Sequence, residues 1–525
     1  MSTDRAALGL DPSKAAACRA AAERIVDDVC RTTERRSTVS IERAVARLLG
    51  VDGVDANDAP LPNVLVDSVA RRGQLHRGVA YWLGCAMLQT GKTPQQLAEA
   101  TARGELHVCD AEVDDPAEVS GLMAERATAA VGEIGSAREE RRAFAAGLED
   151  SAAPGSPLVY VLTATGDVYE DAVHARAVAQ HGGGIVAVIR STAQSLLDYV
   201  PYGPTTEGFG GTFATQANFR IMREAMDDWS AQNGRYIRLS SFCSGLCMPE
   251  IAVMGAIEGF DNMVNDGLYG ILYRDINPVR TLIDQHFSRR VNGMFGITIN
   301  TGEDNYLRTA DALDAAPSVV ASQFINFSLA RRAGVPTRQI AVGSAFEVDP
   351  NVENGLLYEW AYAALTRELF PECPIKYMPP TRHMNGDLFR TQANDTLFNL
   401  ITIATGQEIQ TVGTPSEGIH TPHIHDRVLG LQNAAYVHRF ARDLGSELVF
   451  RPGGLIQTHA AEVLDTALAM LERIRDTSLL QALEDATFGD VSRTPDGGRG
   501  RDGIVDVAPD YLNPFADALV EATYA

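Results

Sequence analysis

Short apolar runs rich in β-branched residues recur along the middle of the chain, and polar residues and a helix-like segment follow each one. We count eight such runs, spaced roughly 20 to 50 residues apart, and each gap has room for a helix. The predicted strands are Leu158–Leu162, Ile185–Ile189, Tyr236–Leu239, Leu268–Tyr273, Phe295–Ile299, Val319–Phe327, Ile340–Val342 and Pro374–Tyr377. This rhythm predicts an α/β fold of the (β/α)8 TIM-barrel class, with a doubly wound open sheet as the alternative. No G-x-G-x-x-G motif follows a predicted strand, which argues against a dinucleotide-binding fold.

The regions on either side of these runs have a different pattern. The first 150 residues are rich in Ala, Arg and Glu at helical spacing and carry few strand signals. The Pro-, Gly- and Ser-rich segment Asp150–Pro157 marks a boundary, and helical patterns return after about residue 385. We therefore expect a helical N-terminal region over 1–150, a barrel core over 151–385, and a helical C-terminal extension over 386–525 that packs partly on the barrel.

The charge and cysteine content argue against several classes of protein. The net charge is -23 and the sequence pI is about 4.9, so neither nucleic acid nor an anionic membrane is expected as a partner. No run of about eighteen apolar residues predicts a membrane span. Seven cysteines in 525 residues do not make a disulfide framework, which favours a reduced, cytoplasmic compartment.

In a TIM barrel, binding and catalytic groups gather where strands end and the following loops begin. The segment Gly182–Gly211 shows this pattern, because a predicted strand ends in Arg190 and hydroxyl groups that include Ser195 and Tyr199 follow. A guanidinium group with hydroxyls and glycines suits an anion, so we expect this segment to bind a phosphate-bearing cofactor. Polar residues also lie in or just after other predicted strands: Ser244, Tyr269, Arg274, Asp304, Asn305, Gln323, Asn326 and Lys376. Such a set suits a bound phosphate together with an amino-acid-like ligand.

Lysine is rare in this chain and occurs only at Lys14, Lys92 and Lys376. A GC-rich genome that replaces lysine by arginine explains the rarity. A lysine that is kept in the last predicted strand therefore invites a functional interpretation, and Lys376 is the only one outside the N-terminal region. The glycine-rich loop at 495–503 has no such signal and is either a solvated turn or a contact with a partner.

Each candidate also has a structural interpretation. Arg190 and Arg274 could be ion-pair partners. Ser244 could cap a helix, and Tyr269 could belong to the core, as aromatic residues in strands usually do. The loop Glu417–Asp426 holds three histidines, which could bind a metal or, as we favour, hydrogen-bond to a large cofactor or substrate.

Four long runs carry a resemblance to a known family. VIRSTAQSLLDYVPYG, TTEGFGGTFATQANFRIMR, SSFCSGLCMPEIAVMGA and DGLYGILYRDIN resemble the α subunit of the lysine 5,6-aminomutase family, which depends on adenosylcobalamin and pyridoxal 5'-phosphate (PLP). The resemblance covers most of residues 150–430. It implies that the barrel binds PLP.

The resemblance also implies roles for individual residues. It implies that Arg190, Ser195 and Ser244 bind the PLP phosphate with Tyr199 nearby, that Tyr269 stacks on the pyridine ring, and that Asn305 lies beside the ring. It implies that Arg274 contacts the cofactor or the substrate, and that Asp304 and Lys376 bind the two ends of the substrate. Glu417 would lie near the adenosyl group. Tyr269 and Glu417 are the residues we expect to be catalytic, and no site residue is expected to bind a metal.

Two parts of such an enzyme are missing from the sequence. The cobalamin signature D-x-H-x-x-G is absent, and no lysine is well placed to form an imine with PLP. The resemblance assigns both to a smaller β subunit, so we expect an α2β2 complex that moves the terminal amino group of D-lysine or β-lysine from C6 to C5 by a radical route. An ornithine 4,5-aminomutase-type activity and a non-catalytic barrel scaffold are the alternatives.

Overall fold

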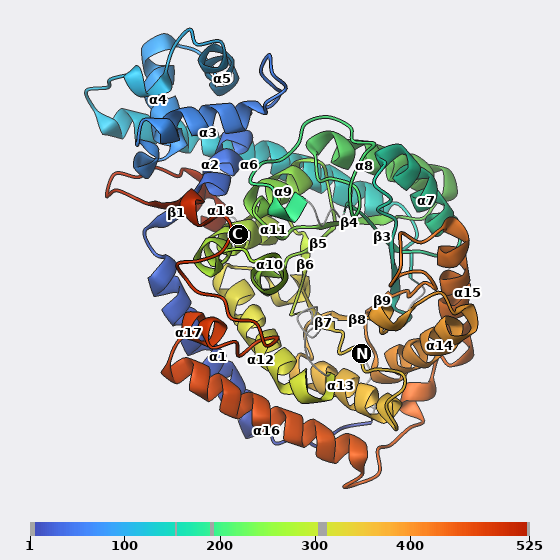
Figure 1. Cartoon of the computed structure of the whole chain (residues 1–525). Helices are drawn as coiled ribbons and strands as arrows, with labels where there is room; N and C mark the ends of the chain where they lie inside the picture. The colour runs from blue at the N-terminus through green and yellow to red at the C-terminus, as the bar shows by residue number, and fades with distance from the viewer. Residues whose placement is uncertain (1–5, 153–154, 190–193, 303–311, 522–525) are drawn as a thin grey trace.

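The computed structural model describes residues 6–152, 155–189, 194–302 and 312–521 (Figure 1). Parallel strands close into a barrel in chain order, and helices surround the ring. The barrel strands are β2 (Leu158–Leu162), β3 (Ile185–Ile189), β4 (Arg238–Phe242), β5 (Asn262–Val264), β6 (Thr298–Thr301), β7 (Ile340–Ser344), β8 (Ile375–Tyr377) and β9 (Ile409–Thr411). The prediction of an eight-stranded (β/α)8 barrel is confirmed.

Two of the predicted strands are wrong. Leu268–Tyr273 lies within helix α10 (Gly267–Arg274), and Val319–Phe327 lies within helix α12 (Ala312–Arg332). Both helices are buried over most of their length, and both predicted runs are short and rich in apolar residues. A run of this length cannot be told from a buried strand by periodicity alone.

Strands β5 and β9 were missed because each has only three residues and carries polar side chains. The remaining predictions hold, with β4 and β6 shifted a few residues toward the carboxyl end. Strand β9 closes the barrel against β2 from residue 409, within the segment 386–525. The barrel therefore continues past residue 385.

Helices fill most of the remaining chain. Helix α1 packs against α12 and α16, and helices α2 to α5 form a group at the upper left of Figure 1. None of the described helices combines the length and apolar character that a membrane span requires. The other helices are α1 (Pro12–Thr33), α2 (Val39–Leu48), α3 (Leu61–Arg71), α4 (Val79–Thr90), α5 (Pro94–Ala102), α6 (Pro116–Ala146), α7 (Val168–Gln180), α8 (Gln216–Asn233), α9 (Met248–Ile257), α11 (Pro278–Met294), α13 (Gly355–Leu369), α14 (Leu388–Thr405), α15 (Ile424–Phe440), α16 (Leu455–Asp476), α17 (Leu479–Glu484) and α18 (Phe515–Glu521).

The interior of the barrel is a small apolar layer. Tyr160, Ile185, Ala187, Ala341 and Ile409 pack together there, one or two from each contributing strand. The outward faces of the strands pack against the surrounding helices in two larger cores. Because both faces of every strand are covered, the strands are short and mostly apolar, as is usual for parallel sheets.

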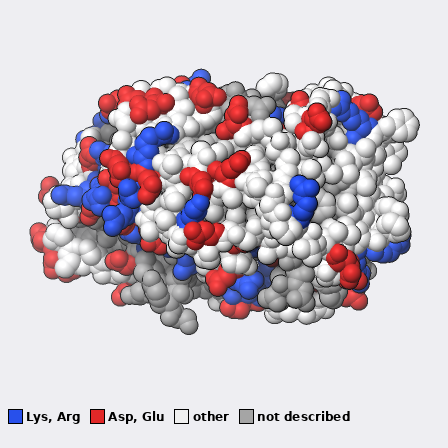
Figure 2. All heavy atoms as spheres, turned by 90° about the horizontal axis from the view of Figure 1, so that it is seen from below, with Lys and Arg blue, Asp and Glu red and all other residues white. Residues whose placement is uncertain are grey.

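Charge is unevenly distributed over the surface. Seen from below, acidic and basic side chains crowd the left part of the molecule, and the right part is mostly uncharged (Figure 2). Helices α14 and α15 lie at the right of Figure 1 and expose Phe389, Tyr436 and Phe440.

The last part of the chain returns to the barrel and to the N-terminal region. The loop at 495–503 packs on the start of α11, because Asn277 Nδ2 donates to the carbonyl oxygens of Pro495 and Gly497 at 2.6 Å each. Strand β10 (Ile504–Asp506) then pairs antiparallel with β1 (Arg36–Thr38). The glycine-rich loop is therefore an internal contact between distant parts of the chain.

A buried carboxyl group joins these terminal segments. Both oxygens of Glu42, on α2, are used: they accept from Ser37 Oγ, Tyr511 Oη and the Val79 N–H, each at 2.7 Å. Burial raises the pKa of Glu42. This single side chain thus connects α2, the start of α4 and the C-terminal segment.

Removing that carboxyl group should destabilise the protein. Glu42→Ala removes the acceptor of three donors, of which only Tyr511 Oη keeps a second contact, with Ser37 Oγ at 3.0 Å, and we expect the free energy of unfolding to fall by about 3 kcal/mol. Urea unfolding followed by circular dichroism measures the change, with the exposed Glu125→Ala on α6 as the control. Equal unfolding midpoints for the two variants would contradict this account of Glu42.

Candidate active site

The structure describes seven of the ten predicted site residues. Arg190, Asp304 and Asn305 lie outside the described residues. The others all follow or belong to barrel strands, at the carboxyl end where sites are found in this fold. They are Ser195, Tyr199, Ser244, Tyr269, Arg274, Lys376 and Glu417.

The loops that carry Ser195 and Ser244 touch each other. Ser195 lies in a short 3-10 helix after β3, and its carbonyl oxygen accepts from the Leu246 N–H at 3.3 Å. Gly245 has a φ of +93°, and a Cβ atom there would lie 2.7 Å from Ser195 Cα. Only glycine allows this approach. The two predicted phosphate-binding hydroxyls therefore belong to one continuous surface.

Charged and polar side chains hold this surface in place. Gln194 bonds with both backbone groups of Ala214, and its Nε2 donates to Ala214 O at 2.8 Å. Asp198 accepts from the buried Arg280 at 3.0 and 3.2 Å. Tyr199, one residue further on, is 43% exposed. The segment after β3 is thus fixed at two points and leaves Tyr199 accessible.

Tyr269 is not in a strand, contrary to our expectation. It lies in the first turn of α10, where Asp266 caps the helix by accepting from the Leu268 N–H at 3.1 Å. Tyr269 Oη accepts from Arg274 Nη2 at 2.9 Å, and the ring is half-buried. Gly270 packs close to Gly245. Helix α10 therefore brings Tyr269 and Arg274 beside the surface formed by the Ser195 and Ser244 loops.

Lys376 points into the barrel from β8. Its Nζ lies 4.3 Å from the centroid of the Tyr160 ring, and the residue is 4% exposed. Tyr160 Oη lies 3.2 Å from Ser240 Oγ, which donates to Asn262 Oδ1 at 2.8 Å. A row of polar groups thus crosses the barrel from the Lys376 cation to β5.

Some buried polar atoms at the carboxyl end of the barrel have no hydrogen-bond partner among the described residues. Asn300 pairs in register with Ala341, and Thr411 with Tyr160, so both side chains share the interior face of the barrel. Among the described residues, neither amide atom of Asn300 nor Thr411 Oγ1 has a hydrogen-bond partner. Buried polar groups rarely stay unpaired, because each costs about 1 to 3 kcal/mol. A polar ligand in the barrel mouth fits these atoms.

Glu417 lies in the loop after β9, where Thr414 Oγ1 donates to its Oε2 at 2.7 Å. Asp395 is buried nearby, and its burial together with the negative charge of Glu417 raises its pKa well above the usual value. The histidine-containing segment continues into α15, and the His423 N–H donates to Asp426 at 3.2 Å. No cluster of three possible metal ligands occurs in the part of the chain that the structure describes.

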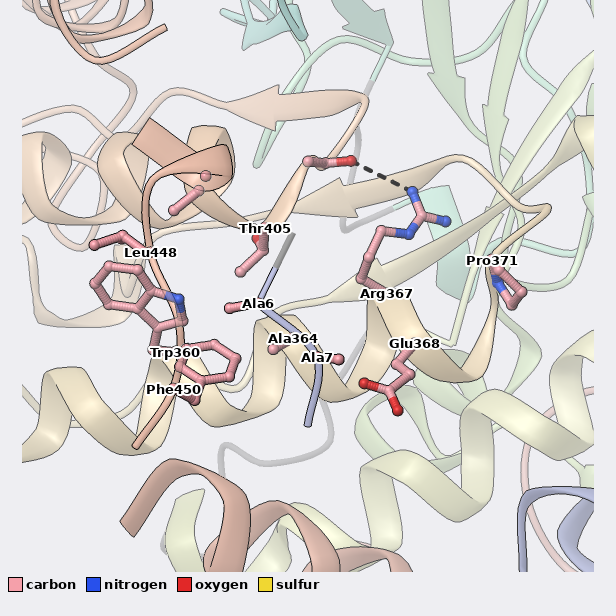
Figure 3. Close-up of a pocket in the computed structure, with 13 residues that line it drawn as sticks. Ala6, Ala7, Trp360, Ala364, Arg367, Glu368, Pro371, Thr405, Leu448 and Phe450 are labelled. Atoms are coloured by element: carbon pink, nitrogen blue, oxygen red, sulfur yellow. Dashed lines mark hydrogen bonds between the residues drawn. The ribbon is translucent and has the colours of Figure 1, made fainter. Parts of the chain in front are cut away.

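The cavity in Figure 3 lies away from this site. It has a volume of about 330 Å³ and is lined by Trp360, Phe450 and the last residues of α13 and α14. Helices end where the next strands begin, so this is the amino end of the barrel. Ala6 and Ala7 also line it, and Glu368 accepts from the Leu8 N–H at 2.9 Å. The cavity belongs to the contact with the N-terminal segment.

Two candidates lie elsewhere than expected, and three other residues gave too little signal to be chosen. Gln323 and Asn326, expected in a strand, lie on α12 outside the barrel wall. Asn300 lies one residue beyond the predicted strand Phe295–Ile299 and was not among the candidates, and Thr411 belongs to a strand that was not predicted. Arg289, in the middle of α11, gave no signal, because a single arginine in a helix has no local pattern.

A buried acid supports the strand that carries Lys376. Tyr377 Oη donates to Glu359 Oε1 at 3.1 Å, and the Val348 N–H donates to Oε2 at 3.3 Å. Burial, reinforced by the charge of Glu347, raises the pKa of Glu359 from 4.5 to about 8. Glu359 is therefore uncharged at neutral pH and connects α13 to β8 and to the segment after β7.

This raised pKa predicts a pH-dependent stability. The folded protein holds the Glu359 proton up to about pH 8, whereas the unfolded chain releases it above its usual 4.5, so stability falls between these values as pH rises. Glu359→Gln removes the titration. The melting temperature of wild type should therefore fall relative to that of Glu359→Gln, and the difference between the two should grow by about 2 °C or more between about pH 5 and pH 8.

Differential scanning calorimetry over this pH range measures the effect. Tyr377→Phe is the control, because it removes the hydrogen bond but leaves Glu359 to titrate, so the fall with pH should persist. Parallel curves for Glu359→Gln and wild type would show that Glu359 does not hold the proton.

A family model described as the D-lysine 5,6-aminomutase TIM-barrel domain of the alpha subunit matches residues 8–518. The chain belongs to this lysine 5,6-aminomutase alpha-subunit family. The match includes the helical regions on both sides of the barrel, so these regions are part of the family architecture as well.

Individual relatives agree with this assignment. The lysine 5,6-aminomutase alpha subunit of Acetoanaerobium sticklandii is 48% identical over 98% of this chain and 98% of its own length. The alpha subunit from Fusobacterium nucleatum is 47% identical over 98% of this chain and 99% of its own length. The D-ornithine 4,5-aminomutase subunit beta of A. sticklandii is 26% identical over 68% of this chain and 50% of that relative.

Proposed function

We propose that this chain is the PLP-binding subunit of an adenosylcobalamin-dependent lysine 5,6-aminomutase. The complex would move the terminal amino group of D-lysine or β-lysine from C6 to C5. The observation that carries the proposal is the meeting of the Ser195 and Ser244 loops beside Tyr269, in a member of the aminomutase family. When bound, PLP supplies an electron-accepting ring for the migrating amine and adenosylcobalamin supplies the radical that removes hydrogen.

The residues of this chain bind and orient the cofactor. The Ser195 and Ser244 hydroxyls, with Arg190, which follows β3 in the sequence, would bind the phosphate through charge-assisted hydrogen bonds. Tyr269 would support the flat pyridine ring, and Arg274 holds the Tyr269 hydroxyl at 2.9 Å and thereby fixes the ring. Glu417, in the loop after β9, would approach the adenosyl group at the mouth of the barrel.

The interior of the barrel would bind the substrate. Lys376 provides a cation in a nearly water-free position, where attraction to a carboxylate is strong. Asp304 would bind the amino group at the other end, and the unpaired Asn300 and Thr411 would hydrogen-bond to the ligand between them. A zwitterionic amino acid needs such a fixed cation and fixed anion to bind in one orientation.

Removal of the Lys376 charge should weaken substrate binding specifically. We expect Lys376→Met to raise the KM for D-lysine by at least about 30-fold, since the substrate carboxylate would lose its buried partner. Affinity for PLP should not change. The exposed Lys92→Met is the control, and steady-state assays of the complex with its partner subunit provide the measurement. A KM equal to that of wild type would remove Lys376 from the substrate site.

The chain lacks a lysine that could hold PLP covalently. Lys14 pairs with Asp465 on the outside of the barrel, Lys92 is exposed before α5, and Lys376 would bind the substrate. We therefore propose that a cobalamin-binding β subunit, carrying D-x-H-x-x-G, also supplies the imine lysine in a cytoplasmic α2β2 complex.

Borohydride reduction of the PLP-loaded complex tests this division. Peptide mapping by mass spectrometry should find the phosphopyridoxyl group only on a lysine of the partner subunit, and the purified single chain should show no turnover. A label on Lys14, Lys92 or Lys376 would contradict the proposed division of the site between two polypeptides.

The partial match to an ornithine 4,5-aminomutase subunit supports a second candidate. D-ornithine is one methylene shorter than lysine, so the distance between the Lys376 cation and the reacting amine decides between them. Parallel assays of the complex with D-lysine, β-lysine and D-ornithine distinguish the candidates. A complex that takes up no PLP and converts none of the three would be a non-catalytic scaffold.

A further inference from the structure

Arg289 lies in the middle of α11 and is completely buried. Its guanidinium group makes five hydrogen bonds within the described residues, and all five acceptors are uncharged oxygens. They are Asn265 Oδ1 and O at 3.0 and 3.1 Å, Thr301 Oγ1 at 2.7 Å, and Asn326 O and Oδ1 at 3.1 Å each. Burial lowers its pKa to about 9, and the charge of Asp266 only partly offsets this effect.

Three of these acceptor atoms lie at the carboxyl ends of neighbouring barrel strands, and the two of Asn326 lie on α12. Asn265 is the residue after β5, and Thr301 is the last residue of β6. Asn265 Nδ2 in turn donates to Cys243 O, just after β4, at 3.1 Å. One guanidinium group therefore connects the ends of three strands, either directly or through one amide side chain.

Each connection leads to a residue of the candidate site. Cys243 precedes Ser244, Asn265 immediately precedes the Asp266 cap of the helix that carries Tyr269, and Thr301 follows the unpaired Asn300. Among the described residues Arg289 forms no salt bridge with a carboxylate, and a buried cation without such a partner costs stability. The fold keeps this cation at the point where three parts of the site meet.

We propose that Arg289 is a positioning residue: its planar fork fixes the ends of β4, β5 and β6 and so aligns Ser244, Tyr269 and Asn300 around the ligand. The inference rests on the proposed function, because it assigns Arg289 to the same PLP and substrate site. Arg289 does not itself touch the ligand and acts through Asn265 and Thr301.

The chain offers a matched control in Arg138, on α6. It is also buried, burial likewise lowers its pKa, and it donates to the carbonyl oxygens of Phe295 at 2.9 Å and Phe260 at 2.6 Å. These two residues precede β6 and β5, so Arg138 holds the opposite ends of the same strands. A merely structural loss should affect Arg138→Met and Arg289→Met alike.

The experiment measures PLP affinity in the complex of this chain with its partner subunit, by titrating the cofactor-free complex and following the absorbance of bound PLP. We expect Arg289→Met to raise the Kd by about tenfold or more, as for other residues that support a binding shell. Arg138→Met should leave it within about twofold of wild type while lowering the melting temperature. Equal Kd values for the two variants would overturn the inference.

Two further variants test the geometry. Arg289→Lys keeps the charge but cannot reach acceptors on three elements at once, so it should bind PLP as weakly as Arg289→Met. Recovery to the wild-type Kd would overturn the role of the planar guanidinium group.

Thr301→Val removes one acceptor of Arg289 and tests its positioning role if Arg289→Met does not fold. It should raise the substrate KM by about threefold or more without a change in PLP affinity, and an unchanged KM would overturn the connection to β6.

Failure of the proposed function has a different signature. If the wild-type complex takes up no PLP, the assignment of the cofactor is wrong before any variant is compared. If the wild-type complex binds PLP, and the Arg289 variants bind it with the same Kd as Arg138→Met, then the proposed function stands and the inference about Arg289 is wrong.

Discussion

Closure of the barrel removes both faces of every strand from water, and the rest of the molecule depends on this constraint. A polar side chain inside the barrel is stable only if it has a hydrogen-bond partner, so the polar side chains that do lie there indicate where such partners are. Lys376 rests on the Tyr160 ring, and Ser240 links that ring to Asn262. Asn300, by contrast, has no partner among the described residues, although it shares the interior face of the barrel.

The burial of both strand faces also explains which strands could be predicted from the sequence and which could not. Strands Leu158–Leu162 and Ile185–Ile189 are long, apolar and bounded by turns, and their limits were predicted correctly. Asn262–Val264 is three residues long, and the neighbouring segment of α10 is more apolar than the strand itself, so the strand was assigned to the wrong run. Periodicity cannot distinguish the two when both are buried.

For the site, Ser195 and Ser244 were predicted from their positions after strands and Lys376 from its position in one, and the structure places them accordingly after β3, after β4 and in β8. Tyr269 was identified as a site residue, but its helix was taken for a strand. Arg289 could not have been found in this way, because only its contacts with three strand ends distinguish it from any other arginine in a helix. Residues that act through others leave their evidence in tertiary structure.

The return of the loop at 495–503 to α11 has a consequence for biosynthesis. Asn277 at the start of this helix is held by Pro495 and Gly497, more than two hundred residues further along the chain. A ribosome makes the chain from its N-terminus, so all the barrel strands emerge before this contact can form. This link between α11 and the C-terminal segment can therefore form only after the whole barrel has been synthesised.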